Sequence, residues 1–195
     1  TLGTLGAGSL AVTGSGGAFT INTNATTIAA QTSGGVLTFT TAGAVTVGTV
    51  NGVAGLNAGA NNLVLNSAGG AVLSQGGGAN TISATGLALT GSLAANLNNA
   101  GNNVGTIASS ATGSLLYADV DTLTVGTVQG VTGINTSGNN LKLSTGGQIT
   151  LAANINVGGA VTVLQTTAGG VTENAGATIT SNSLLLLGGG AMTLT

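Results

Sequence analysis

A long internal repeat constrains the fold of this chain more than any other feature of its sequence. The segment Val-Gly-Thr-Val-Asn-Gly-Val begins at Val47 and returns at Val125, an offset of 78, with Gln in place of Asn. The match continues through Asn-Asn-Leu at 61–63 and 139–141. Because 78 is three times 26, apolar residues also recur at a step of 26. A constant step predicts a chain that winds back onto itself and stacks like residues above like.

Three columns of apolar residues follow this step. The first column is Ala11, Leu37, Leu63, Leu89, Leu115 and Leu141, the second is Phe19, Val45, Ala71, Leu97, Leu123 and Ile149, and the third is Ala30, Leu56, Ile82, Ala108, Ile134 and Ala160. We expect the Leu, Ile and Val residues of these columns to form the core. The pattern predicts an all-β parallel β-helix, or solenoid, with three strand faces, in which each turn pairs with the next.

Short aliphatic and β-branched runs, bounded by Gly-Gly and Asn-Asn pairs, support strands, because no segment holds a helical apolar period. After Leu151 the step shortens to 22, from Leu141 to Val163 to Leu185 and from Ile149 to Val171. We therefore expect one solenoid segment over 1–195, with about seven to eight turns and with a step of about 26 in 1–151 and about 22 in 152–195. The pattern does not fix the hand of the coil, of which right-handed is the favoured alternative. A start without Met and an end within a strand pattern predict a fragment of a longer chain.

Composition narrows the function. The 37 Gly residues suit the sharp corners of a solenoid, since Gly adopts positive φ freely. Only one basic and three acidic residues are present, with no His or Cys. These are the residue types on which acid–base catalysis, metal binding by nitrogen or sulfur, and nucleic-acid binding depend. We therefore expect no enzyme, no cofactor and no nucleic-acid partner. No run of eighteen apolar residues occurs, so the chain is not expected to span a membrane as a helix.

Asp119 and Asp121 form the only acidic pair, and residues two apart in a strand point to the same side. Carboxylate pairs of this kind contribute to Ca²⁺ sites, which makes the pair a weak candidate for one. The favoured alternative is a solvated loop between Tyr117 and the strand at Leu123. Lys142 lies between Leu141 and Leu143, and the alternation predicts that it faces outward.

A Thr-rich column is expected on the outer surface. It consists of Thr20, Thr46, Val72, Asn98, Thr124 and Thr150. An array of Thr-x-Thr motifs on a β-helix would suggest ice binding, but only Thr122 and Thr124 form one along this column. The ordinary β-propensity of Thr is the simpler explanation. A carbohydrate-binding or carbohydrate-degrading β-helix is a further alternative, which the scarcity of charged and aromatic residues disfavours.

Several segments resemble the repeat regions of filamentous-haemagglutinin-like exoproteins of Gram-negative bacteria, which are adhesins of the two-partner secretion type. The resemblance lies in Leu-Asn-Asn-Ala-Gly-Asn-Asn-Val-Gly-Thr-Ile at 97–107, Leu-Thr-Val-Gly-Thr-Val at 123–128, Gly-Val-Thr-Gly-Ile at 130–134 and Ser-Leu-Leu-Leu-Leu-Gly-Gly-Gly at 183–190. It implies a secreted β-helical shaft used in adhesion, aggregation or biofilm. The Asn-Pro motifs of the family's secretion domain are missing, since the chain contains no Pro.

The leading hypothesis is a structural one: the chain forms part of the shaft of a fibre at the bacterial cell surface. Its partners would be other turns of the same chain or neighbouring copies. Faces with little charge would also permit lateral self-association. The alternative is a self-assembling extracellular filament whose subunits stack end to end through unpaired strand edges.

Overall fold

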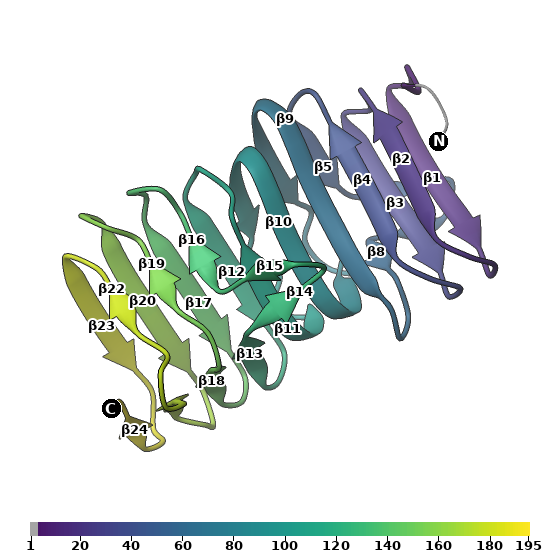
Figure 1. Ribbon diagram of the computed structural model, residues 1–195. Helices are drawn as coiled ribbons and strands as arrows, with labels where there is room; N and C mark the ends of the chain where they lie inside the picture. Colours follow the sequence, from purple (N-terminus) through teal and green to yellow (C-terminus); the bar gives the residue numbers. More distant parts are fainter. Residues whose placement is uncertain (1–3) are drawn as a thin grey trace.

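The computed structural model describes residues 4–195 as an elongated stack of parallel strands, in which each turn of the chain lies on the one before (Figure 1). The described residues contain no helix. The stack is a β-solenoid of about eight turns, which confirms the predicted fold class. The two ends of the chain lie at opposite ends of the stack (Figure 1).

Residues 4–195 form 24 strands. In chain order they are β1 (Ser9–Gly14), β2 (Phe19–Thr23), β3 (Thr27–Thr32), β4 (Leu37–Thr41), β5 (Val45–Val47), β6 (Thr49–Val50), β7 (Val53–Ala54), β8 (Leu56–Asn57), β9 (Asn62–Gln75), β10 (Ile82–Leu97), β11 (Asn103–Ser109), β12 (Leu115–Asp119), β13 (Leu123–Val125), β14 (Thr127–Val128), β15 (Val131–Thr132), β16 (Ile134–Asn135), β17 (Leu141–Thr145), β18 (Ile149–Leu151), β19 (Ile155–Asn156), β20 (Val161–Thr166), β21 (Val171–Glu173), β22 (Ile179–Thr180), β23 (Ser183–Leu187) and β24 (Met192–Thr193).

Parallel ladders run along the stack. In the C-terminal half three ladders are distinct: β12–β17–β20–β23, β13–β18–β21–β24 and β16–β19–β22. In the middle, β9 and β10 are long strands that pass through corners and take part in more than one ladder. Consecutive turns are therefore linked by hydrogen bonds on several sides.

The core fills the inside of the coil. Because side chains alternate along a strand, every second residue points inward. All twelve Leu, Ile and Val residues of the predicted core are buried, none more than 4% exposed: Leu37, Val45, Leu56, Leu63, Ile82, Leu89, Leu97, Leu115, Leu123, Ile134, Leu141 and Ile149. Phe39 and Tyr117 are the bulkiest fully buried side chains.

The constant step of 26 predicted over 1–151 is wrong for much of the stack. It does hold between some neighbours in the ladders: Ala30 and Leu56, Leu37 and Leu63, Leu56 and Ile82, Leu115 and Leu141, and Leu123 and Ile149. Elsewhere the partners differ: Val45 pairs with Leu73, Leu89 with Leu65 and Ser109, Leu97 with Tyr117, and Ile134 with Ser109 and Ile155. The step varies because the corner segments differ in length. It is 18 residues from Phe19 to Leu37 and 28 residues from Val45 to Leu73.

The step of 22 predicted after Leu151 is correct from Ile149 to Val171 and from Val163 to Leu185, but it is wrong from Leu141 to Val163. There the step is one shorter, and Leu141 pairs with Thr162 while Val163 pairs with Lys142. A slip of one residue moves a side chain to the other side of a strand. Val163 and Leu185 therefore lie on the outer surface of the ladder instead of in the core.

Thr162 occupies the inward position in β20, and its hydroxyl has no hydrogen-bond partner among the described residues. A buried hydroxyl without a partner costs free energy, and Val has nearly the same shape. Thr162→Val should therefore raise the free energy of unfolding by about 1 kcal/mol, as measured by urea denaturation. Thr166→Val is the matched control, because the Thr166 hydroxyl donates a hydrogen bond to the Gly169 carbonyl oxygen at 2.6 Å. That variant should be less stable than the parent, and equal effects of the two changes would contradict the explanation.

A β-bulge at Gly91 changes the register between β9 and β10. Gly91 has φ +84°, and a Cβ at this position would run into the carbonyl oxygen of Ser67. Gly91→Ala should therefore lower the free energy of unfolding by at least about 2 kcal/mol, measured in urea. Gly77→Ala serves as the control, because Gly77 is exposed and a Cβ there meets nothing within 4 Å. A similar loss for both variants would mean that the bulge does not require Gly.

Two short hairpins interrupt the solenoid, and the repeat pattern did not predict them. They are β6–β7 and β14–β15, which are the only antiparallel pairs in the described chain. Asn51–Gly52 and Gln129–Gly130 close their two-residue loops with positive φ, as hairpin loops require. β14–β15 lies across the outside of the stack (Figure 1). Its Val128 and Val131 cover an apolar outer column formed by Val64, Ala88 and Ala108.

Candidate functional site

The buried carboxylate of Asp119 is the most unusual chemical group in the described chain. β12 places Leu115, Tyr117 and Asp119 at alternating positions, and all three side chains face the interior. Asp119 is 3% exposed. The predicted solvated loop is therefore wrong for this residue, because the strand alternation continues through Asp119 and the chain bends only at Val120 and Asp121.

Three donors surround this carboxylate. Asp119 Oδ2 accepts hydrogen bonds from the Tyr117 hydroxyl at 2.7 Å and from the Val104 backbone N–H at 2.9 Å. Oδ1 accepts a hydrogen bond from the backbone N–H of Asp121 at 3.1 Å. The carboxylate thereby connects β11, β12 and the corner that follows β12.

The surroundings change the acidity of both side chains. Burial raises the pKa of Asp119 to about 6, while the hydrogen bonds from Tyr117 and from the two backbone N–H groups oppose this rise. Burial also raises the pKa of the Tyr117 hydroxyl far above its usual range, and the neighbouring charge of Asp119 raises it further. Tyr117 therefore stays protonated, and Asp119 is the group that can exchange a proton near neutral pH.

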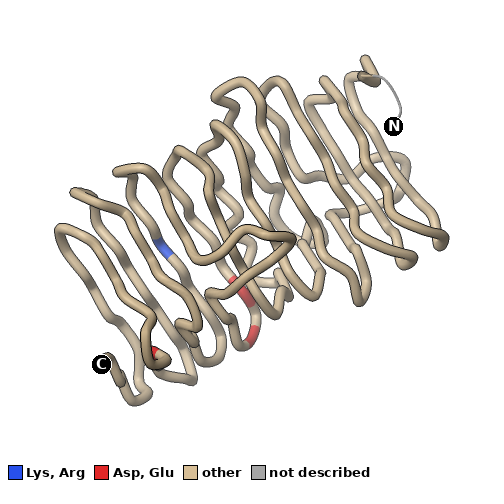
Figure 2. Tube along the Cα trace, viewed as in Figure 1, with Lys and Arg blue, Asp and Glu red and all other residues tan. Residues whose placement is uncertain are grey.

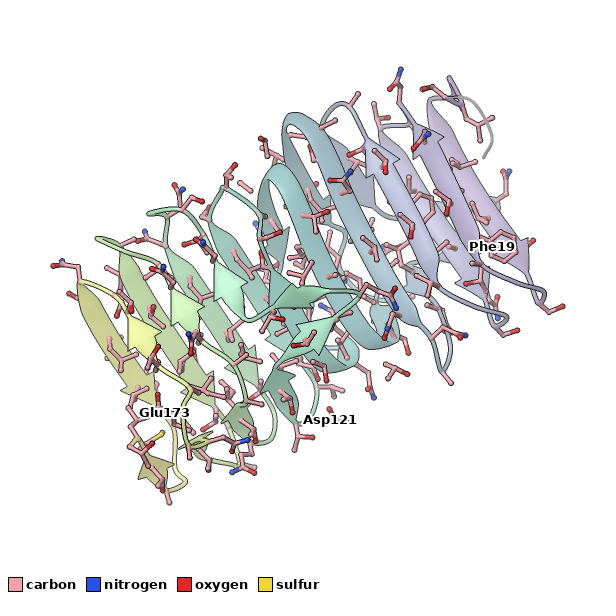
Figure 3. All side chains as sticks on the ribbon, in the orientation of Figure 1. Phe19, Asp121 and Glu173 are labelled. Atoms are coloured by element: carbon pink, nitrogen blue, oxygen red, sulfur yellow. The ribbon has the colours of Figure 1, made fainter. Side chains whose placement is uncertain are left out.

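The two aspartates do not form the expected pair on one side of a strand. Asp119 is buried, whereas Asp121 is exposed at the corner that follows β12 (Figure 3). Three of the roughly four lone-pair sites of the Asp119 carboxylate already accept hydrogen bonds from protein groups. Across residues 4–195 there is no group of three or more His, Cys, Asp or Glu side chains that could hold a metal ion.

A groove of about 260 Å³ lies beside Asp119 on the outer surface. It is lined by polar side chains and backbone from three successive turns, including Ser144, Thr145, Gln165 and Thr167. Asp119 is the only titratable residue among its lining residues. This arrangement can take up a proton, but the groove brings no second acid or base to the carboxylate.

A second buried polar cluster centres on Asn102, which is fully buried. Its side-chain N–H₂ donates to the carbonyl oxygens of Leu97 and Ala118, and its side-chain oxygen accepts a hydrogen bond from the Ile82 N–H. Gln75 also exchanges hydrogen bonds with this amide. The sequence pattern did not predict this cluster, because nothing local distinguishes Asn102 from its neighbours.

Of the predicted Thr column, Thr124 and Thr150 are neighbours in one ladder, as predicted, but the other outer Thr residues belong to different ladders. Thr20 pairs with Thr38, and Thr46 pairs with Thr27 and Ser74, so these residues do not share one ladder. The longest uninterrupted Thr ladder runs through five turns: Thr106, Thr124, Thr150, Thr172 and Thr193. Most of these side chains are half-buried. Lys142 is half-buried on the outer side of β17, where the sequence predicted an outward position.

No helix in the described part of the chain is long and apolar enough to cross a membrane. Comparisons with family models, with curated proteins and with solved structures found no match to the chain. The resemblance to filamentous-haemagglutinin-like repeats therefore stays a hypothesis, and function is inferred from the geometry.

Proposed function

We propose that the chain is a structural segment of the shaft of a bacterial surface fibre or adhesin, exported from the cell and supporting adhesion, aggregation or biofilm. The observation that carries this proposal is the stacking of about eight turns along one direction. A solenoid gains length at constant cross-section, and each turn is stabilised by its neighbours. At about 4.8 Å between strands, the segment supplies roughly 40 Å of shaft.

The site chemistry supports the same proposal. The buried Asp119 carboxylate accepts hydrogen bonds from the Val104 N–H in β11, from Tyr117 of its own strand and from the Asp121 N–H in the corner after β12, which is a structural use of an ionisable group. It ties together two strands and a corner of one turn. The Asn102 cluster links neighbouring turns.

Removal of one whole turn tests the shaft proposal. Deletion of residues 141–161 would join Asn140 to Thr162 and let β20 follow β12 in the same register, because Leu115 and Thr162 are both partners of Leu141. In cells that display the protein, adhesion should persist with this deletion and should disappear with an unfolding substitution in the core. Loss of adhesion by a folded, exported deletion variant would place recognition in this segment and overturn the shaft proposal.

The alternative, a filament of copies stacked end to end, is favoured by one observation. β23 pairs along one edge only, with β20, and its inward-facing Leu184 remains 39% exposed. None of β22, β23 and β24 carries the charges or Pro with which exposed edges are commonly protected. Electron micrographs of the purified chain should then show filaments many times longer than one copy, and uniformly short particles would contradict this alternative.

A further inference from the structure

An apolar patch lies on the outer surface of β12, β17, β20 and β23. Leu116, Lys142, Val163 and Leu185 are successive partners in this ladder, and they face outward because the residues beside them in each strand face the core. Val161 and Leu187 flank them and are 37% and 40% exposed. Leu185 is 48% exposed. We call these six residues the outer patch.

The outer patch is local, because the same ladder is polar in the N-terminal half. There the outward partners are Thr46, Ser74 and Asn96. The outer apolar column of Val64, Ala88 and Ala108 elsewhere in the chain is covered by the β14–β15 hairpin. Among the described residues, the column of Val64, Ala88 and Ala108 is therefore covered by a hairpin, whereas the outer patch is at least partly exposed.

The residues of β23 also indicate a strand that is covered on both sides. Its four leucines, Leu184 to Leu187, point alternately inward and outward. Strands that are apolar on both faces are typical of sheets buried on both faces. A groove of about 320 Å³ crosses the patch and is lined by Leu116, Lys142, Val161 and Val163 among others.

We propose that the outer patch is the interface through which two copies of the chain pack side by side. A two-fold axis that passes between the two copies at the centre of the ladder and runs parallel to the strands would reverse the order of the strands in the second copy. It would place Leu116 of one copy opposite Leu185 of the other, and Lys142 opposite Val163. Leucines would then meet, and the two lysines would not oppose each other. The aliphatic part of Lys142 would lie along Val163 while its ammonium group reaches solvent.

Charge favours a second copy as the occupant. Lys142 is the only basic residue of the chain and the only charged residue of the patch, and the net charge is −2 (Figure 2). Two copies therefore repel each other weakly. Flat sheets commonly pack face to face about 10 Å apart. The interface deepens the proposed structural role, because it specifies the face by which shafts would bundle, but its test requires only the purified chain.

The first experiment measures mass against concentration. By sedimentation velocity, the 18.1 kDa chain should approach twice that mass between about 10 μM and 1 mM, since a patch of six side chains supports weak association. Val163→Lys should remain monomeric throughout, with an unchanged circular dichroism spectrum. Thr46→Lys is the matched control, because it adds the same charge on the same ladder three strands away from Leu116, and it should associate like the parent chain.

The second experiment tests the register. The chain has no Cys, so single cysteines can be introduced without background. A mixture of Leu116→Cys and Leu185→Cys chains should form disulfide-linked dimers at least tenfold faster than either variant alone or Asn96→Cys. A parent chain that stays monomeric at 1 mM, or equal cross-linking in all mixtures, would overturn the interface. It would leave the shaft proposal to its own test in cells.

Discussion

Leu115→Asp is expected to unfold the chain at neutral pH. Leu115 lies in the middle of the stack, is 3% exposed, and pairs with Ala95 on one side and Leu141 on the other. A carboxylate in this position would have apolar neighbours, and burial of an unpaired charge costs several kcal/mol. We expect a loss of about 4 kcal/mol or more in the free energy of unfolding, which is a large part of the stability of an ordinary domain.

Leu116→Asp is the matched control for this substitution. Leu116 is the next residue in β12 and faces outward, so the same carboxylate would reach solvent there. The control chain should keep its β-sheet circular dichroism spectrum, while the Leu115→Asp chain should lose it. A melting temperature of Leu115→Asp equal to that of the parent chain would show that Leu115 is not an interior residue.

The stability of the folded chain is expected to rise when the pH falls from 7.5 to 4.5. The pKa of Asp119 is raised from an ordinary value of 3.8 to about 6 in the folded state, so the folded chain binds a proton more tightly than the unfolded chain. The penalty of a buried charge is therefore present above the folded pKa and is relieved below it. The shift of about two pKa units corresponds to about 3 kcal/mol in total, of which about 2 kcal/mol is gained between pH 7.5 and 4.5 and the rest at lower pH. Urea denaturation at a series of pH values measures this gain.

Asp119→Asn should remove most of this pH dependence, because Asn does not titrate. Asn would keep an acceptor for the Tyr117 hydroxyl and the Val104 N–H, and would lose the hydrogen bond from the Asp121 N–H. Tyr117→Phe should increase the pH dependence, since the ionised carboxylate then loses a donor while the protonated form loses less. Parallel pH profiles for the parent and Asp119→Asn chains would assign the effect to another group.

The sequence predicted the set of inward residues better than the way in which they stack. Val45 was expected beside Ala71 but pairs with Leu73, and Leu89 pairs with Leu65 instead of Leu63. Both shifts are of two residues, which keeps a side chain on the same side of a strand. Burial therefore followed the alternation even where the corner lengths, which a constant step cannot represent, changed the partners.

Some features that the structure shows could have been predicted from the local sequence, whereas others have no local sequence signal. Asp119 follows Tyr117 by two residues, so an inward Tyr117 already implied an inward Asp119. Asn51–Gly52 between two valines is a strong hairpin signal, but this segment was interpreted only as part of the long repeat. The step from Leu141 to Thr162 is one residue shorter than the step of 22 from Ile149 to Val171, and this difference places Val163 on the outer side. The apolar pattern does not reveal it, because Val163 and Val171 both fit a step of 22. The hydrogen-bond partners of Asn102 come from several turns, so the residues next to Asn102 in the sequence do not predict them.

Residues related by the long repeat, with its offset of 78, do not lie in the same ladder of the solenoid. Starting from Leu37 in β4, the ladder passes through Leu63 and Leu87 to Ile107. The repeat places the counterpart of Leu37 at Leu115, which instead continues the ladder that begins at Val45 in β5. The β6–β7 hairpin accordingly lies over β3, whereas β14–β15 lies over β11 and the Val64 column. In a longer array of 78-residue repeats, successive hairpins would therefore lie over different ladders and follow a spiral around the solenoid. The outer surfaces without hairpins, which are open to side-by-side contact, would follow the same spiral.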